Sequence, residues 1–466
     1  MLPSFFRTVI SHPRRWFADG ILVRVLRNAG MLLTGRVATG VLNLAILSIA
    51  ARTLGVSQFG LIILVQTFVQ TVTAIATFQS WQAVIRYGAL TFEHGDTPSF
   101  QRLLRFCTLL DIAGALIGMV AAIVAIPFVG PRLGWDASLM SAAKPYALVT
   151  LFAITATPTG LLRLYNRFDL LAIQSTVSPA VRLIGVGLAA LLDWPLEAYL
   201  GVYFAGGAAA GAVLVAMGWQ QAYANGHLRG FAATPGDWFR IPADHPGLAR
   251  FAIFSNLHVT VQTATGYLAP LLVGALAGPA ATGLFKIARD VATAITRPAE
   301  LLNASVYPEF ARLAGQEKWA AFPRLILRGG GMAAGAGLLI VAFAVFAGPW
   351  FLALFFGADF VGAEACMVLH CVAATLSIAG FGFDPALYAM GRPGIPLQVN
   401  TAALALYLPA LAILAPRFGA TGAGVAGLIA DSSVFIVMGV LTFRLVRRKI
   451  AAQHHASHQS APAAAQ

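Results

Sequence analysis

The sequence predicts an all-α integral membrane protein with about twelve transmembrane helices in two six-helix bundles. Of the 466 residues, 58% are hydrophobic and only 11% are charged, whereas about a quarter of a soluble domain is charged. The apolar residues fall in blocks of about 20, which is the length of a helix that crosses a bilayer. At a mean hydropathy of +0.77, too little polar side chain remains to cover a soluble particle.

Six apolar blocks lie in each half of the chain. We expect the first six spans near 31–51, 60–83, 104–128, 145–163, 170–192 and 197–220. We expect the second six near 249–276, 281–304, 326–347, 361–384, 395–415 and 420–443. A polar stretch at 223–246 separates the two sets. The predicted domains are a basic cytoplasmic or interfacial segment at 1–30, a bundle at 31–222, a cytoplasmic linker at 223–247, a bundle at 248–446 and a disordered cytoplasmic tail at 447–466.

The positive residues favour one orientation of these spans. With a cytoplasmic N-terminus, the inside segments hold 22 Lys and Arg residues and the outside segments four: Arg52, Arg132, Lys144 and Arg417. This bias follows the positive-inside rule, so both termini are expected in the cytoplasm. The net charge of +13 therefore reflects membrane topology, and no nucleic-acid partner is expected.

Motifs typical of soluble enzymes have simpler explanations here. The three cysteines, Cys107, Cys366 and Cys371, lie in apolar stretches without metal-ligand spacing and are interpreted as core residues. Gly422–Gly427 matches a dinucleotide fingerprint, but it lies in an apolar span, where small residues let helices pack closely. No ATP-binding motif is visible, and no metal or cofactor is expected. Energy would come from a proton or sodium gradient, the membrane potential or the substrate's own gradient.

A short internal repeat links the two halves. Residues 54–61 read LGVSQFGL and residues 277–284 read AGPAATGL, each with Gly, four residues and Gly-Leu, at an offset of 223. Both copies join the first and second spans of their half. With six spans per half the copies share one orientation, so the repeat axis is expected along the membrane normal.

The eighth span carries the densest set of intramembrane polar residues, spaced 3, 4, 7, 11 and 14 positions from the first: Lys286, Arg289, Asp290, Thr293, Arg297 and Glu300. At about 100° per residue, all six share one face of a helix. Charges cost several kcal/mol in hydrocarbon, so this face predicts a hydrated cavity. A structural ladder of ion pairs, Lys286–Asp290 and Arg297–Glu300, is the alternative.

Three further spans have polar faces, whereas the others hold isolated polar residues such as Asp111, Arg182, Asp384 and Asp431. The additional predicted substrate-binding residues are Arg36 and Asn43 in the first span, Gln66, Gln70 and Thr73 in the second, and Asn256 and Tyr267 in the seventh. Two lobes are expected to meet through spans 1, 2, 7 and 8 around a central cavity. Its cations outnumber its acids, which favours an anionic group such as a phosphate.

Three segments resemble bacterial polysaccharide flippases of the Wzx type, in the multidrug/oligosaccharidyl-lipid/polysaccharide exporter superfamily. RNAGMLLTGRVATGVLNLAILSIAARTLGVSQFGLIILV (27–65) resembles their N-terminal region. Their eighth helix and the segment after it are resembled by residues 281–313, ATGLFKIARDVATAITRPAELLNASVYPEFARL. The turn after their helix 10 is resembled by residues 386–393, ALYAMGRP.

The resemblance implies a V-shaped, alternating-access transporter of the bacterial inner membrane. Its cargo would be an undecaprenyl-pyrophosphate-linked oligosaccharide of O-antigen, capsule or exopolysaccharide, moved from the cytoplasmic to the periplasmic leaflet. The basic residues Arg36, Lys286, Arg289 and Arg297 match the family's cationic cavity. A monomer is expected, in contact with membrane lipids, a polysaccharide polymerase and a chain-length regulator.

One departure from the family concerns ion coupling. Relatives often place an Asp in span 7 before a Leu-Leu-x-Gly segment, but residues 267–274 read YLAPLLVG without an acid. Asp290 or Glu300 would then have to couple an ion.

Two other functions remain open at this point. A multidrug exporter of the same fold should have an acidic and aromatic pocket, whereas this one is basic. A membrane-embedded glycosyltransferase, ligase or polymerase usually needs a large outer loop with catalytic acids or bases. The outer acids of this chain are scattered over short loops.

Overall fold

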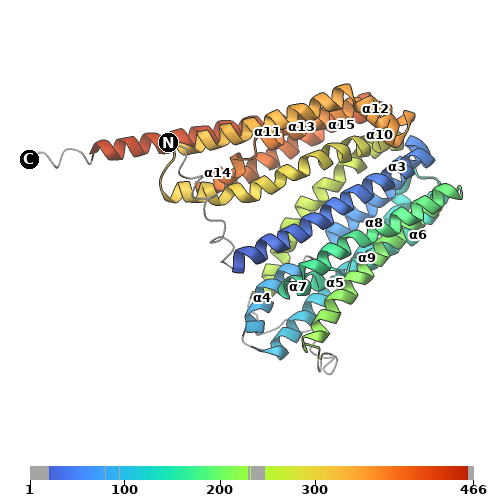
Figure 1. Ribbon diagram of the computed structural model, residues 1–466. Helices are drawn as coiled ribbons and strands as arrows, with labels where there is room; N and C mark the ends of the chain where they lie inside the picture. The colour runs from blue at the N-terminus through green and yellow to red at the C-terminus, as the bar shows by residue number, and fades with distance from the viewer. Residues whose placement is uncertain (1–19, 79, 94, 229–230, 232–246, 460–466) are drawn as a thin grey trace, which may run out of the picture. The chain divides into compact units, whose positions relative to one another are not determined.

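The computed structural model describes residues 20–78, 80–93, 95–228, 231 and 247–459. Side chains are described in the same ranges except at 20–37, 90, 92–93, 249–265, 294–306, 308 and 454–459. Within this part of the chain every regular element is a helix, as Figure 1 shows. Nine stretches of it are long and apolar enough to cross a membrane. The predicted all-α membrane fold is therefore confirmed.

Three of the helices are interrupted by a glycine and account for two predicted spans each. They are α3 (Gly20–Ala76), α10 (Leu248–Gly315) and α15 (Gly394–Gln459), which turn at Gly55, Gly278 and Gly419 with φ of 69°, 86° and 58°. Residues with a Cβ rarely adopt a positive φ. Counting the two arms of each helix separately makes the nine stretches roughly consistent with twelve spans.

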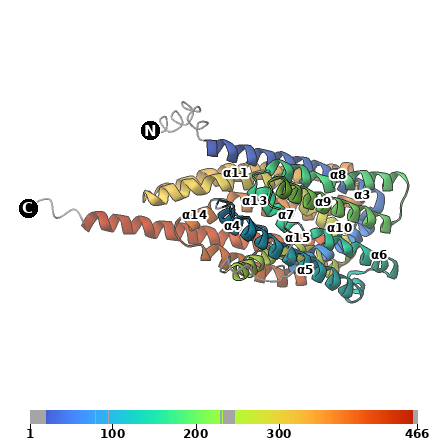
Figure 2. The ribbon, with the colours of Figure 1, turned by 90° about the horizontal axis from the view of Figure 1, so that it is seen from below.

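The remaining helices of the first half form spans 3 to 6, preceded by one short helix, α4. These are α4 (Trp81–Glu93), α5 (Thr97–Val129), η1 (Gly130–Leu133), α6 (Ala137–Ala147), η2 (Leu148–Ala153), α7 (Ala156–Leu164), α8 (Phe168–Leu191) and α9 (Leu196–Ala224). The helices α8 and α9 lie side by side in Figures 1 and 2 and pack along their lengths. The predicted fourth span is a broken one, made of α6, η2 and α7.

The second half also contains short helical elements between its long helices. Its other elements are α11 (Ala321–Phe346), α12 (Gly348–Phe356), η4 (Ala358–Ala363), α13 (Glu364–Ala379) and α14 (Phe383–Ala389). The tenth span is the run η4, α13 and α14. Figure 1 shows α11, α13 and α15 side by side, and α13 packs against both of the others.

The internal repeat found in the sequence has a structural counterpart. Gly55 and Gly278, 223 positions apart, have nearly the same backbone conformation, with φ of 69° and 86° and ψ of 175° at both. Five residues later in each copy, Gly60 and Gly283 lie where another backbone comes close. A Cβ would stand 1.9 Å from the Pro279 carbonyl oxygen at Gly60 and 2.7 Å from that of Val56 at Gly283.

The chain divides into two compact units that do not coincide with its two halves. Unit 1 comprises Met1–Ala50 and Val65–Leu268, and unit 2 comprises Ala51–Leu64 and Ala269–Gln466. The turn of α3 therefore belongs with the C-terminal helices. Arg52 fastens it there, because its guanidinium donates to the carbonyl oxygens of Ala353, Leu354 and Phe355 in the last turn of α12. The Ala353 carbonyl oxygen also accepts from the Gly357 N–H that caps α12. A positive charge at the C-terminal end of a helix interacts favourably with the helix dipole.

A buried carboxylate holds the broken fourth span of unit 1 together. Asp111 on α5 is 2% exposed and accepts from the Thr157 backbone N–H at 2.8 Å and from the Ser80 hydroxyl at 2.6 Å. Thr157 lies in the first turn of α7, and Ser80 directly precedes α4. A negative charge is stabilised at the N-terminal ends of helices. Asp111 therefore links two helix starts, which explains an acid inside an apolar span.

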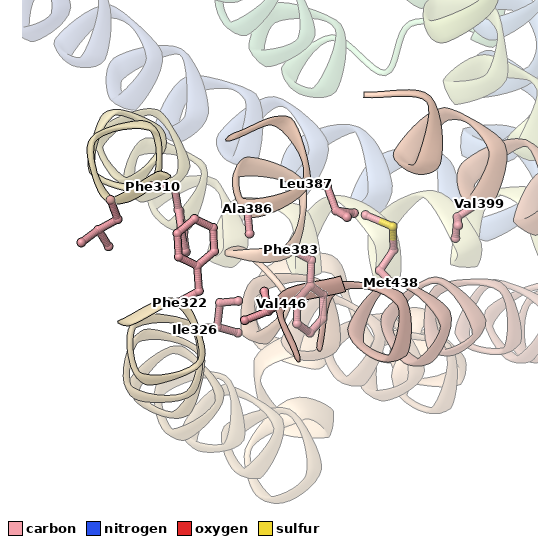
Figure 3. Packing of buried hydrophobic residues seen from close by; sticks show 10 residues of the cluster. Phe310, Phe322, Ile326, Phe383, Ala386, Leu387, Val399, Met438 and Val446 are labelled. Atoms are coloured by element: carbon pink, nitrogen blue, oxygen red, sulfur yellow. The ribbon is translucent and has the colours of Figure 1, made fainter. Parts of the chain in front are cut away.

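An apolar cluster in unit 2 holds the last turns of α10 against three other helices (Figure 3). Phe310 of α10 packs on Phe322 of α11, with ring centroids 5.0 Å apart. Phe383 of α14 and Met438 of α15 extend the cluster. Full burial of each such side chain contributes about 1.5–3 kcal/mol, so α10 has a fixed base in unit 2 beyond its polar stripe.

Candidate functional site

A cavity of about 450 Å³ lies inside unit 2 between α10, α13 and α15. Its polar wall is formed by seven side chains: Arg289, Thr293, His370, Ser377, Asn400, Tyr407 and Asp431. Phe285, Phe381 and several alanines complete the lining. A pocket of this size with a few convergent polar groups is the usual form of a small-ligand site.

The cavity exists because small residues face one another where three helices converge. Ala292 of α10, Ala373 and Ala374 of α13, and Ala403 and Ala430 of α15 all line it. Each leaves room that a leucine would fill. Polar side chains from the same helices then face this space instead of lipid, where each would cost free energy.

Two predicted site residues line this cavity. Arg289 and Thr293 are one helical turn apart on α10, and the Thr293 hydroxyl donates to the Arg289 carbonyl oxygen at 2.7 Å. A guanidinium offers five donors in a planar fork that matches the oxygens of a phosphate or carboxylate. Assignment of Arg289 and Thr293 to the substrate stays a prediction.

The other charged pair of the stripe has a different environment. Lys286 donates to both carboxylate oxygens of Asp290, at 2.9 and 2.7 Å, and neither residue lines the cavity. This is the ion pair that the structural-ladder alternative predicted. Assignment of Lys286 to the substrate and of Asp290 to an ion stays a prediction.

The predicted residues of the first and second spans belong to unit 1. Gln66 is buried, and its side-chain nitrogen has no hydrogen-bond partner among the described residues. The Thr73 hydroxyl donates to the Val69 carbonyl oxygen and lies 3.0 Å from the Thr150 hydroxyl, a structural contact. Asn43 and Gln70 are half-buried.

The remaining predicted residues are outside the cavity lining or outside the described side chains. Tyr267 is half-buried and does not line the cavity. The side chains of Arg36, Asn256, Arg297 and Glu300 lie outside the described residues.

Sequence reasoning missed most of the polar wall. His370, Ser377, Asn400 and Tyr407 were not assigned to a site, and Asp431 was noted only as an isolated polar residue. A single polar side chain in an apolar span was a detectable signal, but no helical period connects residues on three helices.

The histidine is held by its ring contact and not by hydrogen bonds. The His370 ring packs edge-on against Phe285 with centroids 5.2 Å apart, and its Nε2 is buried without a hydrogen-bond partner in the described part of the chain. No group of three or more His, Cys, Asp or Glu among those residues is placed to hold a metal ion.

Comparisons with known proteins agree with this architecture. The family model described as polysaccharide biosynthesis protein matches residues 25–314. Inner membrane protein YghQ of Escherichia coli (strain K12) is 29% identical over 352 residues, which are 75% of this chain and 97% of YghQ.

Solved structures show the same fold at low sequence identity. A multidrug resistance MATE family transporter of the MOP superfamily, in an inward-facing conformation, has a TM-score of 0.67 at 14% identity, over 89% of this chain and 96% of that one. A MOP superfamily transporter from Pyrococcus furiosus has a TM-score of 0.55 at 14% identity, over 91% and 96%. At these identities the likeness shows the fold alone.

The family match covers well over half of the chain, including the repeated Gly-Leu turns and α10 up to Ala314. It confirms the family that the sequence segments resembled, and the helices that it spans build the fold of membrane transporters. The chain therefore belongs to the polysaccharide biosynthesis protein family.

Proposed function

We propose that the protein is a flippase of the inner membrane that moves undecaprenyl-pyrophosphate-linked oligosaccharide repeat units from the cytoplasmic to the periplasmic leaflet by alternating access. The units would serve O-antigen, capsule or exopolysaccharide synthesis. Both termini would be cytoplasmic, in line with the distribution of Lys and Arg. Family membership and the name of the relative YghQ support the process and the membrane.

The observation that carries this proposal is Arg289 on the wall of a cavity inside a membrane-spanning unit. The planar, permanently charged guanidinium matches the oxygens of a phosphate in charge and geometry. In a family of polysaccharide biosynthesis, the anionic part of a lipid-linked sugar is its phosphate group. Hydroxyl and amide groups such as those of Thr293, Ser377 and Asn400 are suited to sugar hydroxyls next to that phosphate.

A second candidate is export of small organic cations. Asp431 with the aromatic Phe285, Phe381 and Tyr407 on the same wall favours it, because a carboxylate and aromatic faces attract cations. Arg289 opposes it, since a cation in the same cavity would be repelled.

The test is a strain deleted for this protein and complemented with variants. Arg289→Gln is expected to abolish surface polysaccharide and to leave lipid-linked repeat units in the cytoplasmic leaflet, with normal protein in the membrane. Arg312→Gln is the matched control, because Arg312 is a cation of the same helix that pairs with Glu309 at the exposed end. It should support normal polymer.

Wild-type polymer from Arg289→Gln would refute the assignment of the cavity. Hypersensitivity of the deletion strain to cationic dyes, with polymer unchanged, would favour the exporter instead.

A further inference from the structure

The second arm of α15 changes from apolar to basic on one side of the helix. Ile436, Val437 and Val440 are 60%, 42% and 43% exposed. Three exposed arginines follow them directly: Arg444, Arg447 and Arg448. At about 100° per residue, these six side chains fall within a sector of about 120°. We call this sector the α15 outer face.

The opposite side of the same turns is packed inside unit 2. Met438, Thr442 and Val446 are 2%, 0% and 0% exposed, and the first and last of them belong to the apolar cluster of Figure 3. Lys449 lies toward this buried side, where its ammonium stands 5.2 Å from the centroid of the Trp319 ring. These contacts hold the end of α15 in one rotational setting, with the outer face turned away from the protein.

The three arginines of the outer face make no hydrogen bond or ion pair within the described part of the chain. By contrast, Arg167 at the start of α8 pairs with Asp169. Arg312 near the end of α10 pairs with Glu309. The positive-inside rule accounts for basic residues at this end of a span. It requires neither a shared face nor the lack of an acidic partner.

An anionic phospholipid has the chemistry that fits both parts of the outer face. From Ile436 to Arg444 the helix rises about 12 Å, close to the roughly 15 Å that one leaflet contributes to the hydrocarbon core. Acyl chains along this stripe bring the head group level with the arginines. Guanidinium groups bind phosphate oxygens through paired hydrogen bonds, and basic clusters directly after a membrane helix attract anionic lipids.

We propose that the α15 outer face binds one anionic glycerophospholipid, with its phosphate on the three arginines and its acyl chains along the apolar stripe. The orientation proposed above puts this lipid in the cytoplasmic leaflet. The ligand is a resident lipid of the bilayer and not the lipid-linked sugar, since none of the six residues lines the cavity of unit 2. Its binding does not depend on the flippase function.

Native mass spectrometry of the full-length protein in detergent resolves bound lipids one by one. The probe is dioleoyl phosphatidylglycerol, and dioleoyl phosphatidylcholine, which has the same chains and no net charge, is the reference. Each basic residue near the head group contributes about fivefold in affinity. Arg444→Gln with Arg447→Gln should therefore bind the first phosphatidylglycerol about 25-fold more weakly than the wild type, with little change for phosphatidylcholine.

The matched control is Lys318→Gln with Arg392→Gln, which also removes two positive charges. Both residues are exposed and lie in turns between helices of unit 2, so neither continues an apolar helix face. This control should bind phosphatidylglycerol like the wild type. Arg444→Lys with Arg447→Lys keeps the charge and should keep most of the affinity, which separates loss of the site from damage to α15.

Unchanged affinity for phosphatidylglycerol in the glutamine variant would overturn the proposal. An equal loss in the control would overturn it as well, because the attraction would then come from the basic surface as a whole. Tighter binding of undecaprenyl phosphate than of phosphatidylglycerol, abolished by the same glutamine variant, would assign the face to the substrate lipid instead. The flippase function is tested separately by Arg289→Gln, so the two proposals can fail independently.

Discussion

A methyl group at position 60 would meet the backbone of a neighbouring turn within unit 2. The Cβ of Gly60→Ala would stand 1.9 Å from the Pro279 carbonyl oxygen, 2.6 Å from its carbon and 3.2 Å from the Gly283 nitrogen. All three atoms belong to the backbone, so no side chain can move aside. Separation to a usual contact of about 3.5 Å requires the two turns to part by roughly 1.5 Å.

The expected cost follows from this shift. Overpacking that forces backbone movement costs about 1–3 kcal/mol, and each kcal/mol lowers the unfolding midpoint of a domain of 150–250 residues by about 2–4 °C. Gly60→Ala should therefore lower the midpoint by roughly 2–12 °C. Gly283→Ala should lower it less, because its Cβ would stand 2.7 Å from the nearest atom, the Val56 carbonyl oxygen.

Buried cysteines provide the assay. Cys366 and Cys371 lie in unit 2 and Cys107 in unit 1, all of them buried and free. In a Cys107→Ala background, a thiol-reactive fluorogenic dye reports the thermal unfolding of unit 2 in detergent.

Gly335→Ala on α11 is the matched control, since its Cβ would have no neighbour within 4 Å. Alanine is also the better helix former by about 0.5–1 kcal/mol, so this control should unfold at or above the wild-type midpoint. A midpoint for Gly60→Ala equal to that of Gly335→Ala would refute the close packing of the two turns.

Three further predictions concern polar contacts. Asp111→Asn should destabilise unit 1 by about 1–3 kcal/mol, measured by dye labelling of Cys107, because the charge at two helix starts is lost; an unchanged midpoint would contradict that role. Arg52→Ala should cost about 1 kcal/mol in the Cys366 and Cys371 assay. Arg132→Ala, which loses one long bond to the Phe128 carbonyl oxygen at the end of α5, should cost nothing measurable in unit 1 when Cys107 is labelled. Burial lowers the pKa of His227, so its neutral form is the stable one. The stability it provides is present above about pH 6.5 and is lost as the pH falls, and this slope should flatten in His227→Gln when the midpoint is followed from pH 8 to 5.

Periodicity predicted the face of α10 well but not the roles within it. Lys286, Arg289, Asp290 and Thr293 share one side of a helix by spacing alone. Whether each meets a partner on its own helix or a cavity depends on what packs against that side. Lys286 and Asp290 are one turn apart and pair with each other. Arg289 faces α13 and α15, whose positions no local pattern predicts.

The span boundaries were also predicted in part from the sequence and decided in part by the structure. At the predicted break between the first two spans, near 51–60, two helical arms meet at a kink where the backbone of Gly55 is not helical. Hydropathy locates such a break, because the turn residues are less apolar. The angle between the two arms depends on one backbone conformation, which a glycine permits but does not impose.

Composition, block length and the positions of Lys and Arg determine on their own that this chain lies in a membrane as about a dozen helices, because lipid as a solvent leaves few other solutions. The repeat at an offset of 223 likewise predicts equivalent turns. Only the tertiary structure decided that Asp431 and His370, each more than eighty residues from Arg289 in the chain, share a cavity with it. Their meeting depends on how α10, α13 and α15 pack, and packing is a property of three surfaces at once rather than of any one stretch of sequence.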